Sequence, residues 1–421
     1  FPSEKLTRNI REATMRQGVE HPVVNDAGFS VWDAYTVRAW PTVILIDPAG
    51  RVISKFEGEI EADQVAPEIE GVIRDFDEQG KIDRSPIQFR LEAESEPQRL
   101  LNFPSKILLI PGNRLFIADS GHHRLLDIEL DHDGTSGRVR RVFGTGNPGL
   151  TDGDASAAQF NDPHGMSYWR GTVYLADTGN HALRAIDVDS GVVRTVAGTG
   201  QKGSGRVEVG QARGVALRSP WAVWAEGDAV LVALAGSHQI GVLMNEREIG
   251  PFAGNGREAL TDGTRQEASF NQPSDLAIGF EYLFVADAEA SAIRAVTLAD
   301  DPKVFTLVGQ GLFDFGDVDG LGPEVRLQHP TGITFHADKL YVADTYNHKI
   351  KTLDPTTGRT ETIIGTGSAG TADGPFRQAE LYEPEGLTIE SGLLYIADTN
   401  NHAVRVANLD LHLVETLAIR E

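Results

Sequence analysis

The chain has 421 residues, of which 40% are hydrophobic, and it contains no cysteine. The missing thiols exclude disulfide bonds, thiolate metal sites and a cysteine nucleophile within these residues. The formal net charge of −23 opposes binding to a phosphate backbone, so we expect no nucleic-acid partner. No apolar run comes near the length of a membrane span, which predicts a soluble protein without a membrane partner.

The first 80 residues combine helical periodicity at both ends with a hairpin pattern in the middle. We expect helices over 6–17, 30–35 and 62–76, a short strand over 22–25, and hairpin strands over 42–46 and 52–56. Trp40, Pro41 and Thr42 stand directly before the hairpin. This order predicts a small α/β domain over 1–80, followed by a linker over 81–88.

From residue 89 to residue 421 one signature recurs six times: Ala-Asp-x-x-x-His, then an apolar residue and a base. Its aspartate position falls at 119, 177, 234, 287, 344 and 398, in steps of 53 to 58 residues. The third copy has Leu234 in place of the aspartate, and the fourth has Ser291 in place of the histidine. Such an even period indicates repeated supersecondary units that bury their apolar faces against one another. The repeat positions are Asp119, His123, Asp177, His181, His238, Asp287, Asp344, His348, Asp398 and His402.

A proline precedes each aspartate position by about 14 residues and marks the start of a strand, where it costs no ladder hydrogen bond. In the second copy we expect strands over 165–169, 172–176, 182–188 and 192–197. Four short antiparallel strands make one propeller blade, so the sequence predicts an all-β six-bladed propeller over 89–421. The last blade is expected to own its fourth strand over 413–418. A strand borrowed from residues 87–91 is the alternative way to close the ring.

Glycine-rich connections separate the blades, and four of the five continue to an Asp-Gly pair, at Asp152, Asp262, Asp319 and Asp373. Each connection joins two strands, with no helix that could supply a dipole for a phosphate. We therefore interpret these glycines as turn residues.

These segments together resemble the family of NHL-repeat-containing protein two, in a bacterial-type form, over essentially the whole chain. The resemblance is most specific over 21–26, 315–320, 327–330 and 346–351. It implies a six-bladed NHL β-propeller preceded by a partial α/β thioredoxin-like domain, of which only the C-terminal half is in the chain. It also implies a cis proline at Pro41 facing a redox motif, so Trp40, Pro41 and Thr42 would form a thioredoxin-like groove. The Cys-x-x-Cys turn of that family would precede Phe1, and we expect the intact protein to have residues upstream.

The repeated histidines suggest a metal site, but each occupies the same turn of its own blade. A ring keeps such residues apart, so they cannot converge on one ion. We interpret the aspartates and histidines as structural, bonding to the turn backbone or to a neighbouring blade. No metal and no cofactor are expected.

The residue after each proline is expected at the mouth of the central channel. These residues differ in chemistry from blade to blade, and packing alone gives less reason for such diversity, so we expect ligand or partner binding there. The candidate positions are Ser105, His164, Trp221, Ser274, Thr331 and Glu385, with Lys106 and Asp275 one step further on.

Two functions remain open at this point. The favoured one is a scaffold that binds a protein or peptide on the propeller loop face and in the cleft beside the thioredoxin-like domain. The alternative is a thiol-disulfide oxidoreductase, or a redox-linked adaptor, whose cysteines lie upstream of Phe1. A weaker third is a metal-dependent propeller hydrolase or lyase using His164, Asp275 and Glu385. We expect a cytoplasmic location, although any N-terminal signal would precede Phe1, and the oligomeric state is left open.

Overall fold

The computed structural model describes residues 1–58, 60, 62–299 and 302–421. The chain divides into two compact units, Phe1–Gln98 and Arg99–Glu421. Among the described residues, no helix has both the length and the apolar character needed to cross a membrane.

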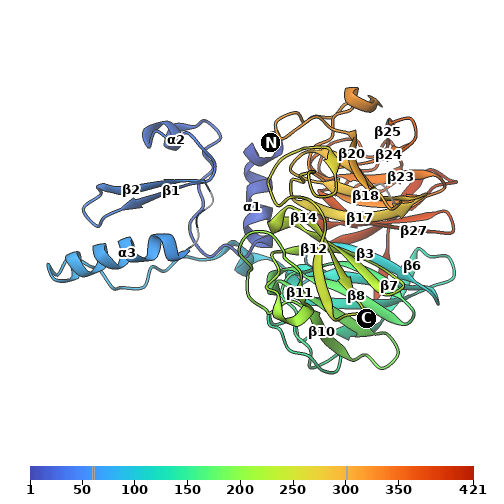
Figure 1. The fold of residues 1–421 in the computed structure, drawn as a ribbon, viewed down its shortest axis with the longest axis horizontal. Helices are drawn as coiled ribbons and strands as arrows, with labels where there is room; N and C mark the ends of the chain where they lie inside the picture. Colours follow the sequence, from blue (N-terminus) through green and yellow to red (C-terminus); the bar gives the residue numbers. More distant parts are fainter. Residues whose placement is uncertain (59, 61, 300–301) are drawn as a thin grey trace. The chain divides into compact units, whose positions relative to one another are not determined.

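The described residues of the first unit form three helices, a two-stranded hairpin and two short 3-10 helices (Figure 1). Asp47 shapes the hairpin turn, because its carboxylate accepts the backbone N–H groups of Ala49 and Arg51. In chain order the elements are η1 (Pro2–Lys5), α1 (Thr7–Arg16), α2 (Ser30–Ala34), β1 (Thr42–Ile46), β2 (Val52–Glu57), α3 (Ala62–Asp77) and η2 (Glu92–Ser95).

The predicted helices and hairpin of this unit are present, but the strand predicted over 22–25 is wrong. That segment has no regular structure, because β1 and β2 pair only with each other. Asn25 starts a turn, because its side-chain oxygen accepts the N–H of Ala27. The Trp40–Pro41 peptide bond is cis, as the resemblance implied. Assignment of this unit to the thioredoxin-like class stays a prediction.

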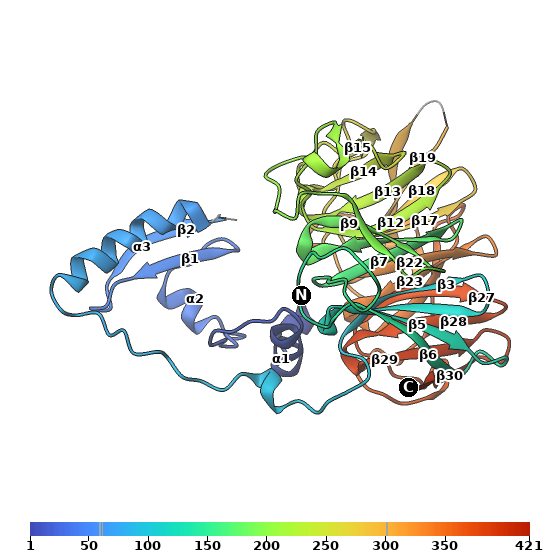
Figure 2. The same cartoon turned by 90° about the horizontal axis from the view of Figure 1, so that it is seen from below.

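The second unit is a six-bladed β-propeller, and each blade contains four antiparallel strands that lie side by side, with the first strand innermost and the fourth outermost (Figures 1 and 2). Blades one to three are β3 (Pro104–Ile110), β4 (Arg114–Asp119), β5 (Arg124–Leu130), β6 (Ser136–Phe143); β7 (Pro163–Trp169), β8 (Thr172–Asp177), β9 (Ala182–Asp187), β10 (Val193–Ala197); and β12 (Pro220–Glu226), β13 (Ala229–Leu234), β14 (Gln239–Met244), β15 (Glu248–Ala253). Blades four to six are β17 (Pro273–Gly279), β18 (Tyr282–Asp287), β19 (Ala292–Thr297), β20 (Lys303–Val308); β22 (Pro330–His336), β23 (Lys339–Asp344), β24 (Lys349–Leu353), β25 (Arg359–Ile364); and β27 (Pro384–Glu390), β28 (Leu393–Asp398), β29 (Ala403–Asn408), β30 (Leu413–Thr416).

Hairpin register explains the constant spacing between the proline and the aspartate position. In blade two Pro163 pairs with Asp177, and the third blade pairs Pro220 with Leu234 in the same way. The proline therefore opens the innermost strand beside the residue that closes the next strand. The two sequence markers are therefore the two residues of one cross-strand pair.

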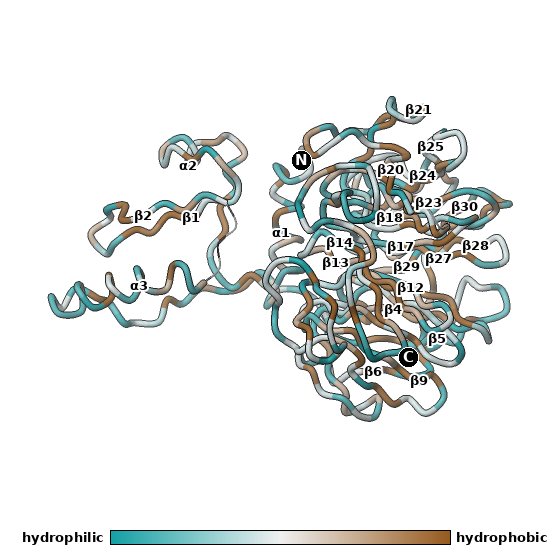
Figure 3. The backbone as a smooth tube through the Cα atoms, viewed as in Figure 1, coloured by the Kyte–Doolittle hydropathy of each residue, from teal (hydrophilic) through white to brown (hydrophobic). Residues whose placement is uncertain are grey.

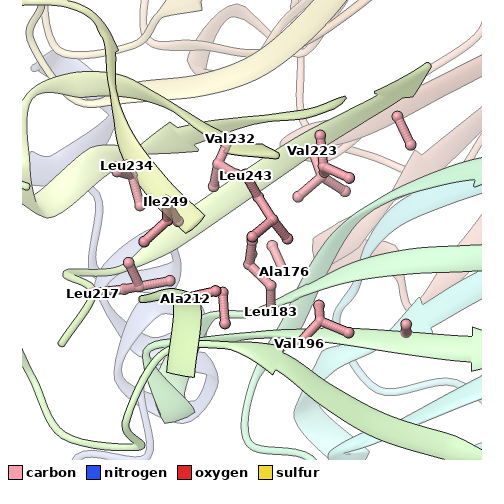
Figure 4. Close-up of a cluster of buried hydrophobic side chains, with 14 of the residues drawn as sticks. Ala176, Leu183, Val196, Ala212, Leu217, Val223, Val232, Leu234, Leu243 and Ile249 are labelled. Atoms are coloured by element: carbon pink, nitrogen blue, oxygen red, sulfur yellow. The ribbon is translucent and has the colours of Figure 1, made fainter. Parts of the chain in front are cut away.

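The apolar core lies between neighbouring blades, because each sheet buries both of its faces. Between blades two and three, Leu183 and Val196 pack with Val223, Leu243 and Ile249 (Figure 4). Coloured by hydropathy, the strands of this unit carry the apolar segments and the turns are largely polar (Figure 3). Such faces are stable only with a neighbour on each side, which favours a closed ring.

Blade six has its own fourth strand, as predicted, and the chain adds a further closure that the sequence did not predict. Blade six ends its fourth strand at Thr416, and β31 (Ala418–Arg420) then pairs in parallel with β6 of blade one. Residues 87–91 form no strand. In blades three to six a two-residue strand from the preceding connection covers the outer edge: β11 (Gly210–Gln211), β16 (Gly263–Thr264), β21 (Gly320–Leu321) and β26 (Gly374–Pro375). Blade one has no preceding connection of this kind, so the C-terminal segment takes that place.

Candidate functional site

The repeated aspartate caps the backbone just ahead of its own blade. In blade two Asp177 accepts the N–H of Asn161 at 2.8 Å on one oxygen and the side chain of Asn180 at 2.8 Å on the other. The same backbone bond recurs in four other blades, from Asn102 to Asp119, Asn271 to Asp287, Gln328 to Asp344 and Tyr382 to Asp398. These carboxylates therefore already accept hydrogen bonds from groups within the propeller.

The base of the signature is buried and joins two carboxylates. Arg184 donates to Asp177 at 2.7 Å and to Asp152 at 3.0 Å, and Asp152 also accepts the hydroxyl of Thr195. Asp152 belongs to the Asp-Gly pair of the preceding connection, so this cluster ties the connection to the blade. Equivalent clusters join Arg294 to Asp262, Lys351 to Asp319 and Arg405 to Asp373.

Burial changes the acidity of the repeat aspartates. Loss of solvation outweighs the attraction of the neighbouring base and raises the pKa of each to about 6. The four residues concerned are Asp177, Asp287, Asp344 and Asp398. They lie in the sheet interior, which makes them structural groups rather than exposed acid-base residues.

In blades one, two, five and six the repeated histidine joins the blade to the next one. His123 Nδ1 accepts the N–H of Asp162 in blade two at 3.1 Å, and His402 accepts that of Phe103 at 3.1 Å across the ring closure. His181 and His348 make the same bond to Ser219 and Glu383, and Ser291 makes it to His329 with its hydroxyl. Burial lowers the pKa of His123 and His181, which favours the neutral ring that such an acceptor requires.

The predicted channel-mouth residues are largely buried instead of facing solvent. Ser105 Oγ lies 2.6 Å from Ser120 Oγ, and Ser120 donates to the carbonyl of Pro163 in the next blade. Thr331 forms the same hydroxyl pair with Thr345 at 2.6 Å. Ser105, His164, Ser274, Thr331 and Glu385 are buried, and Trp221 is half-buried. Hydroxyl-to-carbonyl bonds join neighbouring blades at this level.

His164 and Trp221 form a contact between blades two and three. Their ring centroids are 4.6 Å apart, and His164 Nε2 lies 3.1 Å from a carboxylate oxygen of Asp162. In the part of the chain that the structure describes, no three His, Asp or Glu side chains come together as a group that could hold a metal ion.

Lys106 and Asp275 meet across the central channel. Lys106 Nζ, from blade one, lies 3.0 Å from Asp275 Oδ2 of blade four and also donates to the carbonyl of Thr331. Asp275 in turn accepts the N–H of Ile333 at 3.0 Å. The sequence indicated both residues but not their pairing. The signal that could have found it is opposite charge at the same repeat position, three blades apart.

A cavity of about 460 Å³ fills the remainder of the channel. It extends from Lys106 and Asp275 to Trp169 and Glu226, so the ion pair lies at one end of the cavity. Backbone and apolar side chains of the innermost strands make up most of its wall.

The residues predicted for the thioredoxin-like groove lie beside an apolar depression of the first unit. Trp40 is 72% exposed, and its ring centroid lies 4.3 Å from that of Trp32. Thr42 donates its hydroxyl to the carbonyl of Ala39, and Pro41 accepts the N–H of Gly58. Trp32, Trp40 and Thr42 line a cavity of about 420 Å³, whose other walls include Tyr35 and Ile44.

Sequence reasoning missed one feature of the loop face, the connection between blades four and five. This connection carries Phe313, whose side chain is 88% exposed. Comparing the connections position by position, rather than only by their glycines, would have found it.

Comparison with known proteins supports the reading of the repeats. The NHL repeat family model matches residues 160–186 and 381–407, which contain the signatures of blades two and six. NHL repeat-containing protein 2 of Bos taurus is 38% identical over 454 residues, covering 100% of this chain and 62% of that relative. Protein SUPPRESSOR OF QUENCHING 1, chloroplastic, of Arabidopsis thaliana is 38% identical over 431 residues, covering 97% of this chain and 40% of that protein. A solved virginiamycin B lyase of Staphylococcus aureus shares 13% identity at a TM-score of 0.46, covering 75% of this chain and 84% of that one.

A six-bladed ring held together by the Ala-Asp-x-x-x-His signature defines an NHL β-propeller protein. Within that class, the chain belongs to the family of NHL repeat-containing protein 2. It spans 62% of the length of the Bos taurus relative.

Proposed function

We propose that this protein is a binding scaffold whose propeller recruits a protein or peptide partner on the loop face, the face on which the long inter-blade connections run. The NHL propeller fold is consistent with protein binding, and the proposal assigns that binding to one face.

One observation carries the proposal. The polar groups that recur at the loop-face end of the blades are used within the fold: the aspartates cap backbone, the histidines accept from the next blade, and Lys106 pairs with Asp275. What remains free to differ on this face is the set of connections, whose lengths and sequences vary while the blades keep their register. Variable loops on a rigid frame are the usual place for recognition.

The test is a selection of binding peptides. A phage-displayed library of random peptides is panned on the immobilised full chain, and the selected peptides are synthesised and titrated by calorimetry. Hydrogen exchange of the complex then locates the contact. We expect protection in the inter-blade connections. Failure to select any peptide, or protection confined to the hairpin turns at the opposite end of the blades, would contradict the proposal.

A further inference from the structure

The five inter-blade connections follow one pattern, and one of them departs from it. Each begins with a Gly-x-Gly segment. A backbone N–H a few residues later then donates to the carbonyl of an apolar residue further along the same connection. The donors are Gly149, Gly203, Ala259, Gly316 and Gly370, bonded to the carbonyls of Phe160, Leu217, Phe270, Leu327 and Leu381.

The donor is the third residue after the second glycine in four connections and the fifth residue in the connection between blades four and five. That connection therefore has two extra residues between the second glycine and the N–H donor. Because blades four and five have the register of the other blades, the extra residues are not needed to link them.

The longer connection also differs in chemistry. The corresponding tips carry Asn147-Pro148, Gln201-Lys202, Arg257-Glu258 and Ser368-Ala369, without an aromatic or branched aliphatic residue. Here Leu312 and Phe313 take that place, and Phe313 has the most exposed large apolar side chain among the residues that the structure describes. Val318 and Leu321, further along the same connection, are 46% and 52% exposed.

Hydrogen bonds on both sides hold this tip. Gln310 donates to the carbonyl of Pro323 at 2.6 Å, and Arg326 Nε donates to the Asp314 carboxylate at 2.5 Å. Phe313 thus stands between two anchored neighbours, which reduces the conformational entropy lost on binding.

A groove adjoins the same connection. Its volume is about 540 Å³, and Gly309, Gln310 and Pro323 form one wall. Leu307 of blade four and Asp262 of the connection that precedes this blade also line the groove. An apolar tip beside a groove gives two points of attachment for one extended segment.

The charge of the surface selects the kind of partner. Residues 311–324 contain four acidic residues and no lysine or arginine, in a chain whose net charge is −23. Asp314, Asp317 and Asp319 already form ion pairs with Arg326, Lys349 and Lys351. These pairs partly neutralise the attraction of the three carboxylates for a basic partner. Exposed Glu324 and the overall field still favour a basic segment over an acidic one.

We propose that the connection between blades four and five is the docking site of this scaffold, and that it takes a basic segment of a partner protein. An apolar side chain of that segment packs on Phe313, and the segment continues into the groove beside Pro323. This inference rests on the proposed function and specifies where on the loop face the partner binds.

The experiment uses the peptides selected on the full chain. They are expected to combine lysine or arginine with an apolar residue and to protect residues 309–324 from hydrogen exchange. Phe313→Asp is expected to weaken their binding by at least about tenfold, as the loss of a central aromatic contact does. Deletion of Leu312 and Phe313 together, which restores the spacing between the second glycine and the N–H donor found in the other four connections, is expected to abolish binding without changing the melting temperature.

The matched control is Leu411→Asp, because Leu411 is 72% exposed and lies in the turn between β29 and β30. It should leave peptide affinity unchanged. Peptides that bind another connection, with affinities unaffected by Phe313→Asp, would overturn this inference and leave the proposed function standing. Failure to select any peptide would overturn both. Association of the chain with itself through Phe313, seen as a concentration-dependent mass that the deletion removes, would also overturn the choice of a separate partner.

Discussion

In blade two Asp177 and Arg184 are both fully buried, whereas blade three has Leu234 and Gly241 at the same two positions. The difference extends to their neighbours. Asp152 and Thr195 complete the charged set of blade two, and Val209 and Pro251 stand at those positions in blade three.

The comparison shows that the four positions form one unit. A Cβ atom added at Gly241 would lie 2.9 Å from Leu234 Cδ1, so the leucine occupies the space that an arginine side chain would need to enter. The two sets serve the same fold with the same register. A buried ion pair can often be replaced by apolar residues without loss of stability, provided that both partners are replaced.

The largest effect is expected from breaking the charged set in half. Arg184→Met leaves Asp177 and Asp152 without their shared base, and a buried carboxylate that loses its partner costs about 3–5 kcal/mol. Denaturant unfolding of the propeller should therefore show a large drop in the free energy of unfolding. A loss below about 1 kcal/mol would mean that the arginine is not needed to balance the carboxylates.

The reverse change in blade three should cost somewhat less. Leu234→Asp introduces a carboxyl at a buried position where Gly241 supplies no base, and we expect a loss of about 3 kcal/mol because the group can take up a proton. Adding Gly241→Arg to this variant should recover part of the loss. If the double variant is no more stable than the single one, the two positions are not coupled as proposed.

Exchange of the charged members of the set together should cost least of the three. The variant Asp152→Val, Asp177→Leu, Arg184→Gly gives blade two the residues of blade three at three of the four positions and keeps Thr195, and we expect its free energy of unfolding to lie within about 2 kcal/mol of the starting protein. The remaining cost comes from the Thr195 hydroxyl, which loses its acceptor. A loss equal to that of Arg184→Met alone would contradict the view of the positions as one set.

The pH dependence of stability offers the smallest and most specific test. The four repeat aspartates have folded-state pKa values raised to about 6, above the unfolded value of about 3.9. The folded protein therefore binds these protons more tightly, and their contribution raises the free energy of unfolding as the pH falls from 7 to 5. The exchanged variant has lost one of the four groups, so its stability should change less over this interval. An equal change in both proteins would show that Asp177 does not titrate there.

The sequence predicted the parts of the fold that repeat. The spacing from Pro163 to Asp177 follows from hairpin register, and the positions of His123 and His181 placed them in separate turns. These features depend only on residues near one another in the sequence, so the repeat pattern predicts them. The outcome at 22–25 shows the limit, because a short apolar segment forms a strand only where another strand lies beside it.

The features that the sequence did not predict depend on ring closure. Lys106 reaches Asp275 only because blades one and four face each other across the channel. The burial of Ser105 and Thr331 likewise depends on the neighbouring blade, whose carbonyls accept hydrogen bonds at that level. The type of residue at one position does not indicate which residue of another blade lies next to it. Phe313 is different, since the longer connection is visible in the sequence once the repeats are compared.

The pairing of β31 with β6 has a consequence for the order in which the molecule assembles. Blade one is the first part of the propeller to be synthesised, yet the strand beside β6 comes from residues 418–420. Until those residues have been made, that outer edge keeps unpaired backbone groups and the surface beneath Ile419 stays uncovered. Contacts between such distant segments slow folding, so the nascent chain must carry an incomplete first blade through translation of the other five.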